Sequence, residues 1–114
     1  MRFIKKVIGN IVILDITGEI RLGESAQQIS AELGKTLSDP QVEGVVIQME
    51  NINYIDSTGL GELVGYLGRF QDSGKRLKLV NPNQTVMKLL QLTKLDEVFK
   101  IYRDEEAALE DFVD

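Results

Sequence analysis

The chain has 114 residues, a length typical of one domain with a single hydrophobic core. Its 13 basic and 18 acidic residues give a formal net charge of −5, which argues against a surface for nucleic acid and against a basic patch for membranes. The absence of Cys and His excludes thiol chemistry, disulfides, zinc sites of the usual ligand types and any triad built on a histidine base. The sequence also lacks a signal-peptide pattern and an apolar stretch of about 18 residues, so we expect a soluble cytoplasmic protein.

The first part of the chain predicts an antiparallel hairpin. Residues 3–8 and 11–16 are rich in apolar side chains and flank Gly9-Asn10, a two-residue loop of the kind that closes such a hairpin. Residues 17–25 predict a loop that leads into a helix.

Two helices and a buried strand are expected next. A helix over residues 25–37 is predicted by apolar residues at steps of four, which are Ile29, Leu33 and Leu37. It ends before Asp39-Pro40, because the residue before a proline avoids the helical region. The β-branched run at 45–49 predicts a strand buried on both faces. An amphipathic helix that begins near Asp56 is predicted by Leu60, Leu63, Val64, Leu67 and Phe70.

The remaining chain alternates strands and helices. Gly74 stands where the C-cap of the central helix is expected. We expect strands over 77–80 and 98–102, and helices over 84–92 and 104–112. Such alternation predicts parallel strands with right-handed crossovers. The fold class is therefore α/β, a single domain with a mixed, mostly parallel β-sheet opened by an antiparallel hairpin and about four helices.

The join between the central strand and its helix has an unusual composition. Asp56 and Ser57 lie where the helix begins, and short oxygen-bearing side chains there commonly accept hydrogen bonds from the free amides of the first turn. Four glycines follow within the helix, each about 0.8–1 kcal/mol less favourable than Ala, and they are Gly59, Gly61, Gly65 and Gly68. The last three form a strip beside Thr58 that leaves the backbone open to close approach. A neighbouring element of the same domain or a partner protein could use this strip.

Catalysis and nucleotide binding are not indicated. Residues 68–76 resemble a phosphate-binding loop at first sight, but five residues separate the glycines where four are required, and Arg76 stands where Ser or Thr should bind Mg²⁺. The segment also follows a helix, whereas a phosphate loop follows a strand. The acidic run at 104–106 is typical of a solvated helix N-terminus. We expect no enzyme activity, no metal and no cofactor.

Several segments together resemble a STAS domain. The most specific is 54–61, which has the order Asp-Ser-Thr-Gly-Leu-Gly after a buried strand. The others are residues 74–82, 89–95 and 105–107. More narrowly, the chain resembles the bacterial anti-sigma factor antagonists from about residue 11 to 112. The resemblance implies a single STAS domain over 1–114.

The resemblance also implies transcription regulation by partner switching. In that family the unphosphorylated antagonist binds an anti-sigma factor that is also a serine kinase, and the sigma factor is released. The kinase then phosphorylates the serine after the motif aspartate, here Ser57, and a PP2C-type phosphatase restores the unmodified form. The residues expected to contact the partner are Arg21, Asp56, Ser57, Thr58, Gly59, Gly61, Glu62 and Gly65. We expect a monomer or weak dimer that binds neither nucleic acid nor membrane.

One position departs from the family pattern. Many of these antagonists carry an aspartate a few residues after a Thr-Gly-Glu-like stretch, whereas here residues 17–20 are followed by Arg21. The replacement changes the local charge by about two units, and charges at the rim of an interface chiefly affect association rate and partner choice. Arg21 is equally compatible with an ordinary solvated loop residue.

Two other functions stay open. A STAS domain can be a non-phosphorylated interaction module in a larger signalling scaffold or beside a membrane transporter, and Ser57 would then be only a helix cap. The domain could also bind or hydrolyse nucleotide itself, although the missing phosphate loop counts against this.

Overall fold

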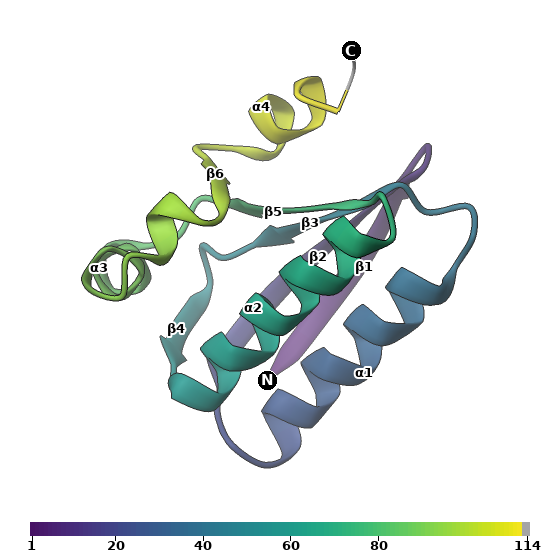
Figure 1. The fold of residues 1–114 in the computed structure, drawn as a ribbon. Coiled ribbons are helices and arrows are strands. Elements are labelled where there is room, and N and C mark those ends of the chain that lie inside the picture. Colours follow the sequence, from purple (N-terminus) through teal and green to yellow (C-terminus); the bar gives the residue numbers. More distant parts are fainter. Residues whose placement is uncertain (113–114) are drawn as a thin grey trace.

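The computed structural model describes residues 1–112, which form a six-stranded sheet with helices on both faces (Figure 1). β1, β2, β3, β5 and β6 follow one another across the sheet, and β4 pairs with the end of β2. In chain order the elements are β1 (Arg2–Ile8), β2 (Ile11–Ile20), α1 (Glu24–Ser38), β3 (Gly44–Gln48), β4 (Ile52–Ile55), α2 (Ser57–Asp72), β5 (Arg76–Val80), α3 (Gln84–Leu92), the 3-10 helix η1 (Leu95–Glu97), β6 (Lys100–Tyr102) and α4 (Glu105–Glu110).

The strand pairing matches the sequence prediction. β1 runs antiparallel to β2, from the pair Ile8 and Ile11 at the turn to the pair Arg2 and Thr17. β2, β3, β5 and β6 run parallel, and helices connect them. The predicted fold class is confirmed, because the described residues form a mixed and mostly parallel sheet opened by a hairpin, with four α-helices.

The predicted loop over residues 17–25 is wrong in its first half, because β2 continues to Ile20. The first half of β2 pairs with β3. After a register shift between Gly18 and Glu19, the second half pairs with β4. β2 therefore carries the chain to the edge of the sheet where α2 begins.

β4 was not predicted from the sequence. It has only four residues, and Asn53 and Tyr54 in its middle are exposed. Ile52 and Ile55 are buried, but two apolar residues three apart do not show the alternation of a strand. Pairing with β2 satisfies the backbone of this segment.

The main hydrophobic core lies between the sheet and the helices α1 and α2, which lie side by side on one face (Figure 1). Leu14 and Ile47 of the sheet, Leu33 of α1 and Phe70 of α2 are fully buried there. A smaller cluster on the opposite face lies under α4, and its buried members are Ile11, Ile13, Val46, Val80 and Ala108.

The C-terminal elements follow the prediction with two corrections. α3 has the predicted bounds, and Asn83 caps it by accepting from the Val86 N–H at 3.0 Å. The expected strand over 98–102 begins only at Lys100, because the chain first makes the turn of η1. The expected helix over 104–112 is shorter than predicted and ends at Glu110, with Asp104 as its cap.

Candidate functional site

Asp56 joins two segments at the start of α2. Its Oδ1 accepts from the Gly59 N–H at 2.9 Å, which caps the helix, and its Oδ2 accepts from the Leu22 N–H at 2.8 Å. These backbone hydrogen bonds, that of Gly59 first, lower the pKa of the Asp56 carboxyl below its ordinary value. A charged Asp56 therefore fixes the loop between β2 and α1 against the first turn of α2.

Ser57 is the first residue of α2 and its side chain is exposed. The helix cap is Asp56, so the sequence-based alternative in which Ser57 serves as the cap does not describe this helix. Thr58 follows and is half-buried. Ser57 is therefore exposed to solvent next to Asp56, whose carboxylate already accepts the Gly59 and Leu22 N–H groups.

The glycines of α2 fall into two groups. A Cβ on Gly59 would lie 2.8 Å from Cγ2 of Ile20 and 3.0 Å from the Ile20 carbonyl oxygen, so the close contact with β2 requires glycine there. A Cβ on Gly61, Gly65 or Gly68 would meet no atom within 4 Å. No neighbouring element in residues 1–112 therefore explains these three glycines, and the strip they form is open.

A groove of about 420 Å³ runs between the N-terminal halves of α1 and α2. Thr58 and Glu62 line it from α2, and the exposed side chain of Leu22 lines it from the loop. Small side chains line it from α1, which are Ala26, Ser30 and Ala31. The structure thus brings Thr58 and Glu62 together with the loop that Asp56 holds, and Gly61 lies exposed one residue before Glu62.

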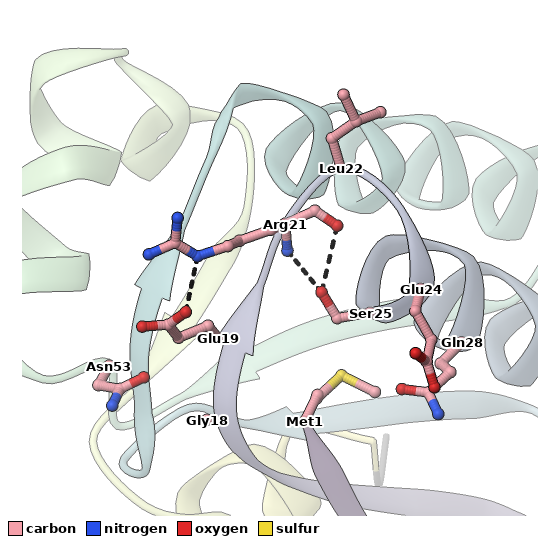
Figure 2. A pocket seen from close by; sticks show the side chains of 9 residues that line it. All are labelled: Met1, Gly18, Glu19, Arg21, Leu22, Glu24, Ser25, Gln28 and Asn53. Atoms are coloured by element: carbon pink, nitrogen blue, oxygen red, sulfur yellow. Dashed lines mark hydrogen bonds and ion pairs between the residues drawn. The ribbon is translucent and has the colours of Figure 1, made fainter.

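Arg21 lies on the same loop and belongs to a second hollow, of about 580 Å³, shown in Figure 2. Its Nε donates to Glu19 Oε2 at 2.6 Å, and its guanidinium lies 4.2 Å from the centre of the Tyr54 ring. The hydrogen bond to Glu19 raises the pKa of Arg21 above its ordinary value. The Arg21 N–H also donates to Ser25 Oγ at 2.7 Å, so both the backbone and the side chain of Arg21 are held in place (Figure 2).

A third hollow lies on the other side of Ser57 and was not predicted from the sequence. It is a groove of about 500 Å³ between the start of α2 and helix α3, with a mostly apolar lining. Its lining residues are Tyr54, Ile55, Asp56, Ser57, Thr85, Val86, Lys88, Leu89 and Leu92. The spacing of Leu89 and Leu92 could have suggested an apolar face on α3, but the sequence does not show which segment this face meets or that Leu92 stays 77% exposed.

Two kinds of site are absent from the described part of the chain. Residues 1–112 contain no group of three or more metal-ligating side chains arranged to hold an ion. None of the helices described in them has the length and apolar character to span a membrane.

The family model for the STAS domain matches residues 2–108, so the chain belongs to the STAS domain family. The resemblance seen in the sequence is confirmed, and it extends to anti-sigma factor antagonists. The anti-sigma F factor antagonist of Paenibacillus polymyxa is 24% identical over 99 residues, which cover 87% of this chain and 84% of that protein.

Solved structures show the same likeness. The protein TM1081 of Thermotoga maritima is 30% identical, with a TM-score of 0.88 over 96% of this chain and 92% of that one. The anti-sigma factor antagonist SpoIIAA in its unphosphorylated form is 23% identical, with a TM-score of 0.84 over 97% of this chain and 96% of that one. A structure of SpoIIAA from Bacillus in the phosphorylated form has a TM-score of 0.76 over 97% of this chain and 99% of that one. At this identity the likeness to SpoIIAA establishes the fold.

Proposed function

We propose that this chain is an anti-sigma factor antagonist whose unphosphorylated form binds an anti-sigma factor serine kinase, so that a sigma factor is released. Phosphorylation of Ser57 ends this binding, and a PP2C-type phosphatase restores it. In this proposal the chain is a cytoplasmic binding protein without catalytic activity of its own. The observation that carries the proposal is the exposed hydroxyl of Ser57, placed directly after an aspartate that already caps α2.

The surface around Ser57 supports contact with a protein partner. Gly61 and Gly65 leave the backbone of α2 open, so a partner can approach it closely. Leu22 is 77% exposed at the rim of the groove that Thr58 and Glu62 line. A partner that covers Leu22 would remove this apolar side chain from water, which favours binding. Asp56 holds the loop and the helix together, so the partner meets one preformed surface.

Phosphorylation would change this surface chiefly through charge. A phosphate adds about −1.5 to −2 charges at neutral pH and three acceptor oxygens. The N-terminus of α2 favours an anion by about 0.3–1 kcal/mol, so the fold tolerates the modification. A partner that covers Ser57 must strip water from the phosphate next to the charged Asp56, which weakens binding unless the partner supplies Arg or Lys.

Arg21 has a secondary role in the proposal. It lies one residue before Leu22, at the rim of the proposed contact surface, and is held by Glu19 and Tyr54. A fixed cation at the rim favours partners with a matching carboxylate and affects the rate of association. We propose that Arg21 influences which kinase is recognised.

The experiment that tests the function is incubation of the chain with ATP and an anti-sigma factor serine kinase, followed by mass mapping of the modified residue. We expect one phosphate on Ser57, none on the variant Ser57→Ala, and an unchanged site in Thr58→Ala. A kinase that is active on another antagonist but leaves this chain unmodified would favour the non-phosphorylated interaction module.

A further inference from the structure

The groove on the α3 side of Ser57 contains one basic residue, Lys88, on the wall opposite the serine. The α3 residues that line the groove follow the spacing of one helix face, and they are Thr85, Lys88, Leu89 and Leu92. Lys88 therefore lies on the side of α3 that faces the start of α2.

The width of this groove is set by the fold. Asn83 caps α3 and also donates through Nδ2 to the Ile52 carbonyl oxygen of β4. Val86 and Leu90 of α3 are buried in the main core. Because α3 is anchored to β4, and β4 leads directly into Ser57, the two walls keep their relative positions.

Among the described residues that line this groove, Lys88 is the one cation. It is exposed, and it forms no ion pair with a carboxylate of residues 1–112. Arg21 is already engaged by Glu19 at 2.6 Å and by the Tyr54 ring at 4.2 Å. Both carboxylate oxygens of Asp56 accept backbone N–H groups, and Asp56 forms no ion pair with Lys88.

We propose that Lys88 pairs with the phosphate of phosphorylated Ser57 across this groove. The inference rests on the proposed function in that it requires Ser57 to be the modified residue. A phosphate offers three acceptor oxygens, and the flexible stem of lysine lets its ammonium follow them. The pair links the first turn of α2 to α3 and closes the mouth of the groove, so phosphorylation both adds charge and covers the apolar lining.

The test uses protein in which phosphoserine is incorporated at position 57 during translation, so that no kinase is needed. The second pKa of the phosphate is measured by ³¹P NMR, because a cation within ion-pair distance favours the dianion and lowers this pKa. We expect Lys88→Gln to raise the second pKa by about 0.3–0.5 pH units, the size expected for an exposed ion pair. Lys88→Arg keeps the charge and should stay near the wild-type value.

The matched control is Lys35→Gln, which removes the same charge from the last turn of α1, whereas Ser57 lies in the first turn of α2. Figure 1 shows α1 and α2 side by side and running in the same direction, so the last turn of α1 lies at the end of the helix pair away from the start of α2. Lys35→Gln should change the pKa by less than about 0.1 unit, because salt screens distant exposed charges.

Equal pKa values in Lys88→Gln and Lys35→Gln would overturn the proposal, as would a shift that appears in Arg21→Gln but not in Lys88→Gln. Failure of the kinase experiment described above would disprove the proposed function, whereas the ³¹P titration would still report whether Lys88 meets a phosphate at this position. The two proposals can thus fail separately.

Discussion

Asp56 stabilises the site through its charged form. Its pKa is lowered by the backbone N–H of Gly59 first and of Leu22 next. A carboxyl whose pKa is lower in the folded state contributes stability above its unfolded pKa, and this stability is lost as the pH falls through the folded value. The connection between the loop and α2 is therefore complete at neutral pH and weakens in acid.

Replacing Asp56 tests this connection. We expect Asp56→Ala to lower the midpoint of thermal unfolding by a few degrees at pH 7, because the helix loses its cap and the Leu22 amide loses its acceptor. Asp56→Asn should lower it less, because its side-chain oxygen can still accept from Gly59. Calorimetry from pH 7 down to about 2 measures both effects, and the gap between wild type and Asp56→Asn should narrow in acid. Equal unfolding midpoints at pH 7 for wild type, Asp56→Ala and Asp56→Asn would contradict the role of Asp56 as the link between the loop and α2.

The helix α2 combines a packed glycine with open ones, although all look alike in the sequence. Gly59 is closed in by Ile20, whereas Gly61 faces open space. We expect Gly59→Ala to destabilise the protein by about 1–3 kcal/mol, because the added methyl group overlaps the β2 backbone. Gly61→Ala should stabilise it by about 0.5–1 kcal/mol through helix propensity.

Urea denaturation of both variants measures these changes, and Gly68→Ala serves as a second open-position control.

Gly61→Ala should also bind the anti-sigma factor kinase more weakly than wild type despite its greater stability, because the methyl group fills the open strip. A Gly61→Ala protein that is more stable and binds equally well would remove the strip from the proposed interface.

The helix α4 is held by a buried charge on the face of the sheet opposite α1 and α2. Lys78 is 1% exposed, and its Nζ donates to Asp111 Oδ2 at 3.2 Å and to the Ala108 carbonyl oxygen at 3.2 Å. The Tyr102 hydroxyl also donates to Asp111. The hydrogen bonds from Tyr102 and Lys78 lower the pKa of Asp111 to about 2. Burial, followed by the hydrogen bond to Asp111, raises the pKa of Tyr102 to about 12.

Removing the carboxylate should loosen this end of the molecule. Asp111→Ala leaves Lys78 buried without an opposite charge, so we expect a fall of several degrees in the midpoint of thermal unfolding. Adding Lys78→Met should restore part of the loss, because an apolar side chain needs no such partner. The lowered pKa means that wild type keeps this contribution above about pH 4 and loses it as the pH falls towards about 2. A double variant no more stable than Asp111→Ala would contradict this account.

At the scale of the whole molecule, phosphorylation should leave the fold intact. Ser57 is exposed and its backbone lies in a regular helix, so a phosphate displaces no core residue. We expect the midpoint of thermal unfolding to change by less than about 2 °C. Amide chemical-shift changes should concentrate near the first turn of α2, the loop that contains Leu22, and α3. Changes throughout the sheet would instead indicate a rearranged fold.

The regular elements of the molecule could be predicted because each carries its own local signal. The bounds of α3 follow from the cap Asn83 and the apolar spacing after it, and the hairpin follows from Gly9-Asn10 between two apolar runs. The junction at Asp56 and Ser57 was located for the same reason, since a polar cap between a buried strand and an amphipathic helix is a local pattern.

The remaining features depend on contacts between distant segments. β4 is stabilised by pairing with β2 rather than by its own composition, so its short sequence gives no strand pattern. The different roles of Gly59 and Gly61 depend on which side of α2 meets Ile20. The groove that contains Ser57 and Lys88 exists only because α3 packs beside β4. The residue spacing within α3 does not show that it packs there.

Binding of an anti-sigma factor serine kinase to three forms of the chain decides whether Ser57 is a switch. Isothermal titration should compare the unmodified protein, Ser57→Ala and the Ser57-phosphorylated protein under the same salt conditions. We expect equal affinity for the first two and an affinity at least about tenfold lower for the phosphorylated form, because its phosphate must be desolvated beside Asp56. Equal affinity for all three forms would contradict a switch at Ser57.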